Sequence, residues 1–194
     1  MSIVDTAWIF DIDGVITNPS EKKVKEPQIL VHIADKLKSG EPVAFNTGRS
    51  SSWLIERVIN PLLEMIEGKS VLQNFIAVSE KGGCWVTFDK DGTMQEHKAD
   101  SISVPVGKGF ATERILDLLK KKGIKPKQFI AFGDSPSDIT MAEKLHERNL
   151  TFTFIFVDDK GELKGVEHPF PIVYTKDKFD KGTLEFLRKH SGGL

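Results

Sequence analysis

The sequence predicts an α/β protein, a Rossmann-like three-layer sandwich with a parallel central sheet. Three observations favour this fold: short apolar runs of strand length, segments of helical periodicity between them, and polar turns directly after several of the runs. Of the 194 residues, 39% are hydrophobic, which suffices for a core without disulfides or a structural metal. We therefore expect a single domain over residues 1–194.

The predicted strands are runs dense in Ile, Val, Phe and Trp, with hardly a polar residue inside: 7–10, 43–45, 75–78, 129–132 and 152–157. Such runs are typical of strands buried on both faces of a parallel sheet. A further stretch, 83–98, alternates apolar and polar residues around Asp91-Gly92 and predicts a β-hairpin. We expect this hairpin to be a small flap or minimal cap on the domain.

The predicted helices lie between the strands and carry their own start and stop signals, such as Pro at the first position and Gly after the last. They are expected at 27–40, after serines 50–52 with an interruption at Pro61, from about 109 to 123, from the N-cap Ser135 onward, and at 182–189. The stretch 158–171 is rich in Gly, Pro and charge and predicts a loop.

The charge balance argues against polyanionic partners. The 27 Lys and Arg and 28 Asp and Glu give a net charge of −1, so we expect neither nucleic acid nor an anionic membrane as a partner. The single cysteine, Cys84, cannot form an internal disulfide, and no apolar run is long enough to cross a bilayer. No Lys or Arg precedes Lys22, unlike a secretory signal, and we expect a cytoplasmic protein.

Polar residues follow three of the predicted strands at the point where each ends. The segment 11–14 (DIDG) follows the first strand, 46–49 (NTGR) the second, and 133–138 (GDSPSD) the strand at 129–132. Lys108 opens the third helix, at a terminus that can face the same edge of the sheet. Ligands of open α/β sheets bind beyond the carboxyl ends of the strands, so we expect these residues to meet there.

Carboxylates that converge at one edge predict a bound cation, because they would otherwise repel one another. Hard oxygen ligands select Mg²⁺. We expect Asp11 and Asp134 to bind Mg²⁺ through their carboxylates and Asp13 through its carbonyl oxygen. Asp138 and Ser135 would lie behind these ligands and support them.

The same residues suggest phosphoryl transfer. Beside a cation and Lys108, Asp11 stays ionised and can attack phosphorus, whereas its neighbours push Asp13 toward the protonated form of a general acid and base. Thr47, the Gly48 backbone and Lys108 would bind the phosphoryl oxygens.

Each piece also has a purely structural interpretation. Asp-x-Asp-Gly and Thr47-Gly48 are common turn sequences, Ser135-x-x-Asp138 is a helix-capping pattern, and an isolated Lys108 is an ordinary surface lysine. The order of the four pieces, one strand after another at the same edge, favours the chemical interpretation.

In this order the motifs resemble those of the haloacid dehalogenase (HAD) superfamily of phosphohydrolases. The resemblance covers residues 7 to about 146 and rests on 10–17 (FDIDGVIT), Thr47, Lys108 and 133–138. It implies a HAD-like hydrolase domain with these roles: Asp11 as nucleophile, Asp13 as general acid and base, Thr47 and Lys108 as phosphate binders, and Asp134 and Asp138 on the metal side.

Within the superfamily the pattern is most similar to the Cof-type sugar-phosphate phosphatases, with two departures. Ser137 stands where those relatives usually have Asn, and only about ten residues separate His97 from Lys108, where they insert a large cap. We therefore expect an open site, which either accepts bulky or macromolecular phosphates or is closed by a neighbouring subunit. The substrate we expect first is a small phosphorylated compound, such as a sugar phosphate or related metabolite. A homo-oligomer would close such a site.

The predicted function is Mg²⁺-dependent hydrolysis of a phosphomonoester through an aspartyl-phosphate. Two alternatives stay open: a phosphomutase, which needs the phosphoaspartate shielded from water, and a receiver-like signalling domain, which accepts a phosphoryl group without turnover.

Overall fold

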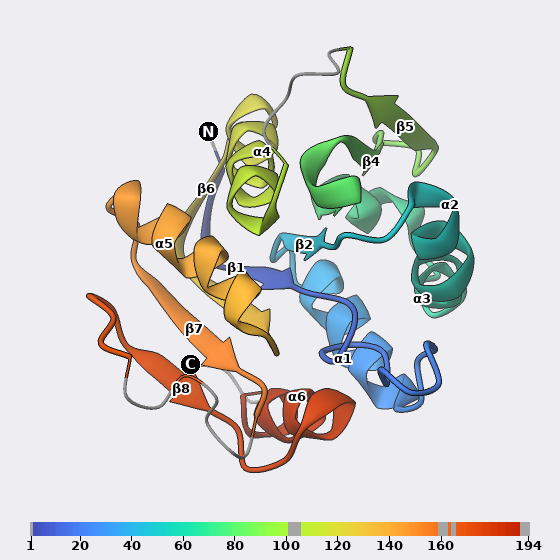
Figure 1. Ribbon diagram of the computed structural model, residues 1–194. Coiled ribbons are helices and arrows are strands. Elements are labelled where there is room, and N and C mark those ends of the chain that lie inside the picture. The colour runs from blue at the N-terminus through green and yellow to red at the C-terminus, as the bar shows by residue number, and fades with distance from the viewer. Residues whose placement is uncertain (1, 101–105, 159–162, 164–165, 191–194) are drawn as a thin grey trace.

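The computed structural model describes residues 2–100, 106–158, 163 and 166–190, and these residues form one eight-stranded sheet flanked by helices (Figure 1). The strands are β1 (Ser2–Phe10), β2 (Val43–Asn46), β3 (Phe75–Ser79), β4 (Cys84–Phe88), β5 (Met94–Lys98), β6 (Ile124–Gly133), β7 (Phe152–Phe156) and β8 (Ile172–Tyr174). Their order across the sheet is β5-β4-β3-β2-β1-β6-β7-β8. All neighbours are parallel except that β4 is antiparallel to β3 and β5.

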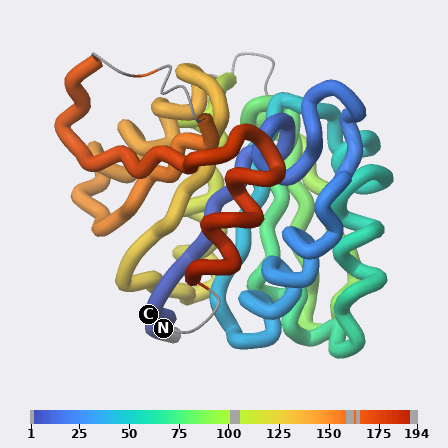
Figure 2. The backbone as a smooth tube through the Cα atoms, turned by 90° about the horizontal axis from the view of Figure 1, so that it is seen from below, coloured from blue at the N-terminus to red at the C-terminus, as the bar shows by residue number. Residues whose placement is uncertain are grey.

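Helices cover both faces of the sheet. They are α1 (Pro27–Lys38), α2 (Ser51–Leu54), α3 (Asn60–Glu64), α4 (Lys108–Lys121), α5 (Ile139–Glu147) and α6 (Phe179–Lys189). In Figure 1, α4 and α5 lie together, and α1 and α6 lie across the sheet from them; Figure 2 shows α6 (red) beside α1 (blue). The predicted three-layer α/β sandwich is confirmed.

The two faces of the sheet carry two separate apolar cores. Because side chains alternate along a strand, Trp8 and Phe10 of β1 enter the core beneath α1 and α6, while Ala7 and Ile9 enter the core beneath α4 and α5. In the first core Phe10 stacks on Phe132 with ring centroids 4.7 Å apart. Burial on both faces explains why these strands consist almost entirely of apolar residues.

β1 and β6 are longer than the sequence predicts. They pair in register from Ser2 opposite Ile124 to Phe10 opposite Phe132, whereas the apolar runs covered only 7–10 and 129–132. The added segments carry polar residues that reach solvent, among them Asp5 and Lys127, which form an ion pair. An apolar run marks only the buried half of such a strand. The short strand β8 was also missed.

The predicted hairpin forms, but it is not a flap. β4 pairs with β3 and extends the central sheet, with Ile76 opposite Thr87, and β5 is its outer strand. Since β4 is antiparallel to β3, the Asp91-Gly92 turn points to the amino-terminal edge of the parallel strands. This edge is opposite to the one at which the sequence places the site, so the hairpin at 83–98 extends the sheet and is not a flap over that site.

The helical segment after Ser50 is not interrupted at Pro61. α2 passes through a π-helical turn (Ile55–Ile59) into α3, and Pro61 is an early residue of α3. The Asn60 N–H bonds to the Ile55 carbonyl, so the wider turn lies just before the residue that has no N–H to donate.

The remaining helix predictions agree in type, with small shifts in their bounds. The segment after Ser135 begins with a 3₁₀ turn (Pro136–Asp138) before α5, and α6 begins at Phe179, three residues early. Of the expected loop at 158–171, residues 159–162 and 164–165 lie outside the described residues, and the described remainder contains no helix or strand. Among the helices that are described, none combines the length and apolar character needed to span a bilayer.

Candidate functional site

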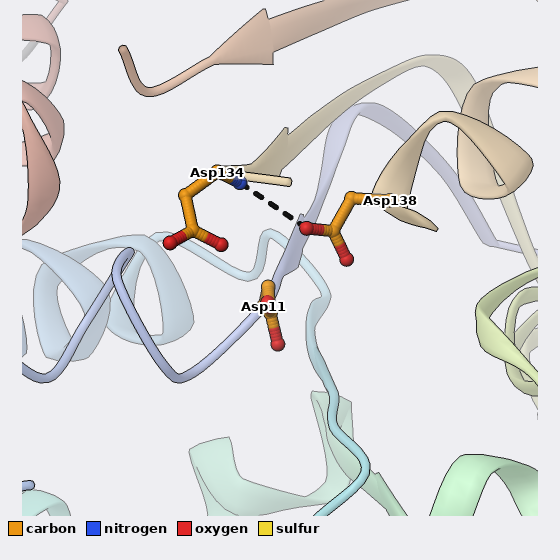
Figure 3. Close-up of side chains that lie close together, drawn as sticks. All are labelled: Asp11, Asp134 and Asp138. Carbon is orange, nitrogen blue, oxygen red and sulfur yellow. Dashed lines mark hydrogen bonds between the residues drawn. The ribbon is translucent and has the colours of Figure 1, made fainter. Parts of the chain in front are cut away.

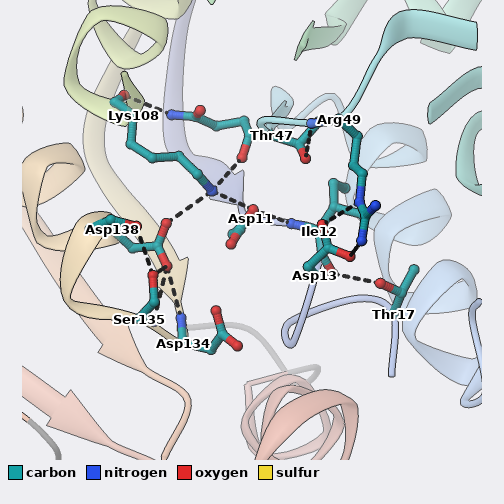
Figure 4. A network of polar contacts seen from close by, with 12 residues as sticks. Asp11, Ile12, Asp13, Thr17, Thr47, Arg49, Lys108, Asp134, Ser135 and Asp138 are labelled. Carbon is teal, nitrogen blue, oxygen red and sulfur yellow. Dashed lines mark hydrogen bonds and ion pairs between the residues drawn. The ribbon is translucent and has the colours of Figure 1, made fainter. Parts of the chain in front are cut away.

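The sequence-predicted residues converge at the carboxyl edge of the sheet. Asp11 follows β1, Thr47 follows β2, Asp134 follows β6, and Lys108 is the first residue of α4 (Figure 4). The central position of β1, between β2 and β6, explains the convergence, because the two flanking strands deliver their terminal residues to either side of Asp11.

A buried lysine joins two of the acids. The Lys108 ammonium forms ion pairs with Asp11 and, at 2.9 Å, with Asp138, and it also donates to the Asn46 carbonyl at 3.0 Å. The Lys108 side chain is only 12% exposed. Such burial places its charge in a medium of low polarity, where each pairing is stronger than at the surface.

Asp138 also caps the helical turn that follows β6. Its Oδ2 accepts hydrogen bonds from the Ser135 hydroxyl at 2.8 Å, the Ser135 N–H at 3.0 Å and the Asp134 N–H at 3.2 Å. The capping interpretation of Ser135-x-x-Asp138 is therefore confirmed, and the same carboxylate also contacts Lys108. One oxygen of Asp138 fixes the 134–138 turn, and the other holds Lys108.

Three carboxylates lie close enough to share a cation. Asp11, Asp134 and Asp138 each bring one oxygen within 4.8 Å of the other two (Figure 3). No lysine or arginine of the described residues pairs with Asp134, and Asp138 is already engaged on both oxygens. The donor set that fits Mg²⁺ is thus the carboxylates of Asp11 and Asp134, hard oxygen ligands in a partly buried site.

Without a bound cation, the pKa values of Asp11, Asp134 and Lys108 reflect this crowding. Burial raises the pKa of Asp11 to about 7, with Lys108 opposing the rise and Asp138 adding to it. Burial also raises the pKa of Asp134 to about 7, and Asp138 again contributes. Burial disfavours the Lys108 ammonium, but Asp11 and Asp138 outweigh it and raise the pKa of that group. A divalent cation would favour the ionised form of both carboxylates.

Asp13 stands apart from this cluster, in a two-point ion pair. Arg49 donates from Nε to Oδ2 at 2.9 Å and from Nη2 to Oδ1 at 2.8 Å, and this pairing raises the pKa of Arg49. The guanidinium also lies over the Trp53 ring, 4.9 Å from its centroid. The contact with Arg49 was not predicted from the sequence. The role of the Asp13 carbonyl toward a metal stays a prediction.

The segment after β2 is held by its neighbour β3. The Thr47 N–H donates to the Val78 carbonyl at 3.0 Å, and the Thr47 hydroxyl accepts from the Arg49 N–H at 3.2 Å. Asn46, which the sequence reasoning did not select, is fully buried and donates to the Lys108 carbonyl at 2.9 Å. Through Asn46 the end of β2 is tied to the start of α4. Thr47 and Gly48 therefore follow a residue that is bonded to Lys108.

Two glycines permit the close approach of the acidic turns. Gly14 has a φ of 73°, and a Cβ at this position would lie 1.7 Å from an oxygen of Asp134. A Cβ at Gly133 would lie 2.2 Å from the Cβ of Asp138. Gly14, the last residue of the 11–14 motif, therefore leaves room for the Asp134 carboxylate as well as forming the turn.

A separate hollow lies away from the acid cluster. An open depression of about 950 Å³ lies at the opposite, amino-terminal edge of β1, lined in part by Thr6, His32 and Glu41. There Lys36 covers the Trp8 ring at 3.4 Å from its centroid, and the Trp8 indole donates to Glu41. Because the predicted chemical residues all lie at the other edge, we assign the candidate site to the acid cluster.

No family model and no curated protein matches the sequence. Similar folds occur among solved structures. A protein of Thermoplasma acidophilum aligns over 98% of this chain and 99% of its own, with a TM-score of 0.59 at 13% identity. A haloacid dehalogenase-like hydrolase from Bacteroides thetaiotaomicron aligns over 96% and 99%, with a TM-score of 0.59 at 12% identity. The trehalose-6-phosphate phosphatase of Aspergillus fumigatus aligns over 95% and 93%, with a TM-score of 0.57 at 12% identity.

These likenesses show that the chain has the fold of HAD-like hydrolases over almost its whole length. At such low identity they identify the fold and not the reaction. The residues at the carboxyl edge of the sheet determine which reaction the chain can support.

Proposed function

We propose that this chain is a HAD-type phosphatase, a Mg²⁺-dependent phosphomonoester hydrolase that acts through an aspartyl-phosphate. The observation that carries the proposal is the Asp11 carboxylate at the end of β1, paired with the buried Lys108 and lying beside Asp134. The fold shared with HAD-like hydrolases is consistent with this activity.

In the first step Asp11 attacks the phosphorus of the ester, a P–O bond to Asp11 forms, and the bond to the leaving alcohol breaks. Lys108 and Thr47, with the Gly48 backbone, bind the phosphoryl oxygens as negative charge develops on them. Asp13 begins the cycle protonated and gives this proton to the departing oxygen, so that the alcohol leaves neutral and Asp13 becomes a carboxylate.

In the second step water attacks the phosphorus of the aspartyl-phosphate and passes a proton to Asp13. The products are inorganic phosphate and the free Asp11 carboxylate. Asp11 and Asp134, with the Asp13 carbonyl, would hold Mg²⁺, which supplies positive charge to the transferring group. Arg49 would set the orientation of Asp13 between the two steps.

The substrate class we propose is a small phosphorylated metabolite, such as a sugar phosphate. The hairpin cannot close the site, because its tip lies at the other edge of the sheet. Closure by a second copy of the chain remains part of the proposal, and light scattering tests it.

Phosphate release from a panel of phosphorylated sugars, nucleotides and phosphopeptides, with and without Mg²⁺, tests the function. Hydrolysis that requires Mg²⁺ is the expected result. Transfer between two positions of a sugar without phosphate release would indicate a phosphomutase. A stable phosphoaspartate at Asp11 without turnover would indicate a receiver-like domain.

A further inference from the structure

The corner between β3 and β4 holds two successive non-glycine residues in the left-handed backbone region. Glu80 has a φ of 51° and Lys81 a φ of 54°, and Gly82 follows with a φ of 105°. Side chains other than Asn and Asp rarely adopt this conformation, which persists only where the surrounding structure enforces it. Such strain concentrates at functional sites.

The backbone of this corner is bonded to both predicted phosphate-binding segments. The Lys81 N–H donates to the Thr47 carbonyl at 3.1 Å, and the Lys81 carbonyl accepts from the Gly107 N–H at 2.9 Å, next to Lys108. The Glu80 N–H donates to the Arg49 carbonyl at 2.9 Å. These bonds enforce the unusual conformation and place Lys81 between the end of β2 and the start of α4.

The Lys81 side chain lies along Gly48. A Cβ built on Gly48 would be 3.6 Å from Cε of Lys81, the carbon that bears the ammonium nitrogen. Lys81 is exposed, and no carboxylate of the described residues forms an ion pair with it. An ammonium group without an acidic partner therefore stands at the solvent side of the Thr47-Gly48 loop.

The solvent side is where a leaving group must lie. Asp11 and Thr47 form the buried floor, with 6% and 0% exposure. In-line attack by Asp11 directs the leaving oxygen away from that floor, toward the side that Asp13 and Arg49 border at 34% side-chain exposure each. Lys108 lies on the buried side, where the phosphoryl group would bind. Lys81 lies on the exposed side, where the leaving alcohol would bind.

Building on the proposed function, we infer that Lys81 is a specificity-determining residue that binds a second anionic group on the leaving alcohol. The substrate class is then a phosphomonoester with a further negative charge, such as a carboxylate, within a few bonds of the ester oxygen. A charge-assisted hydrogen bond from the ammonium would provide the discrimination.

The test compares 3-phosphoglycerate with glycerol 3-phosphate, which differ only in a carboxylate replaced by a hydroxymethyl group. We expect the wild-type protein to favour 3-phosphoglycerate by about tenfold in kcat/KM, mainly through KM. In Lys81→Asn this preference should fall to about one. Asn tolerates the left-handed conformation, so the variant should keep its fold. Lys90→Asn, at the distant hairpin turn, is the matched control and should keep the preference.

Binding without turnover separates this inference from the proposed function. Calorimetry on Asp11→Asn, alone and combined with Lys81→Asn, should show the same preference and its loss. If no ester is hydrolysed but this binding pattern holds, the hydrolase proposal fails and the role of Lys81 stands. Equal kcat/KM for both compounds in the wild type, or an unchanged preference in Lys81→Asn, would overturn the inference.

Discussion

Asp11 and Asp13 are each paired with a different basic side chain, and this pairing separates their roles. Lys108 is buried between Asp11 and Asp138, whereas Arg49 holds Asp13 from the exposed side. Asp11 is thereby kept at the floor, beside the residues that would bind phosphate. Asp13 is kept at the opening, where it can exchange protons with a leaving group or with water.

Asp11→Asn should lower kcat by about 10³ or more, equivalent to at least about 4 kcal/mol, because a carboxamide oxygen cannot replace a carboxylate in attack on phosphorus. Phosphate release and thermal melting measure activity and fold together. Asp5→Asn, on the exposed part of β1, is the matched control and should be neutral. Near wild-type turnover by a folded Asp11→Asn protein would exclude covalent catalysis through this residue.

Arg49→Met should lower kcat by roughly 10- to 100-fold, since Asp13 loses the two-point pairing that orients it. The loss should fall mainly on kcat, because the residues proposed to bind the phosphoryl group are untouched. Arg57→Met is the control, as among the described residues Arg57 forms an ion pair with its exposed neighbour Glu56 alone. Equal kcat in the two variants would show that Arg49 has no part in positioning Asp13.

Site residues could be predicted from the sequence where they follow the end of a strand. They could not be predicted where their role depends on a contact between distant segments. Asp11 comes directly after an apolar run, and Thr47 and Asp134 each come one residue further on. Arg49 follows Thr47 by two residues, a usable signal, but its pairing with Asp13 is between distant segments. Lys81 gave no signal, because a lysine in the left-handed region contradicts its usual preference.

Among the elements, the turn after β1 contributes most to the geometry of the site. Its Gly14 takes a positive φ and admits the Asp134 carboxylate into the space a side chain would fill. The turn after β6 fixes the other side of this contact, because Asp138 accepts hydrogen bonds from the Asp134 and Ser135 N–H groups. The two turns therefore position the two proposed metal ligands jointly.

Gly14→Ala and Gly40→Ala form a matched pair that isolates this contact. Both glycines have positive φ, 73° and 82°, so both variants should lose about 1 kcal/mol or somewhat more of stability to backbone strain. Only at Gly14 would the added Cβ collide with Asp134; nothing lies within 4 Å of the position at Gly40. We expect Mg²⁺ affinity and kcat to fall in Gly14→Ala alone. A similar loss of Mg²⁺ affinity in both variants would contradict the positioning argument.

The bounds of the strands could be predicted most accurately where both faces of the strand are buried. Apolar runs located β2, β3 and β7 almost to the residue, because both faces of those strands are covered. The alternating pattern at 83–98 predicted a hairpin correctly. Its direction could not be predicted, because the same alternation suits a free flap and an antiparallel sheet edge.

At the scale of the whole molecule, the burial of Asp11 and Asp134 opposes folding when both are ionised and no cation is bound. Asp11 and Asp134 both have a pKa raised from 3.8 to about 7, chiefly by burial. Between these two values the folded protein binds more protons than the unfolded chain does. Their combined contribution to the free energy of unfolding therefore falls as the pH rises from about 4 to about 7, and it is lowest above that range.

Added Mg²⁺ should reverse this loss. Ionised carboxylates bind the cation, so the rise in Tm caused by a fixed excess of Mg²⁺ should be small at pH 5 and larger at pH 8, where protons no longer compete. At 100 times Kd the stabilisation would reach about 2.7 kcal/mol.

Asp134→Asn provides the decisive comparison for this effect of Mg²⁺. It removes one proposed ligand and also one of the two carboxyls that burial disfavours in their charged form. Without Mg²⁺ at pH 8 the variant should therefore melt at or above the Tm of the wild type, yet gain little when Mg²⁺ is added. Thermal melts at pH 5 and pH 8, with Mg²⁺ or EDTA, measure both effects. A Mg²⁺-induced rise in Tm that is the same at both pH values, or that survives in Asp134→Asn, would place the cation elsewhere, because only carboxyls with a raised pKa link binding to pH in this range.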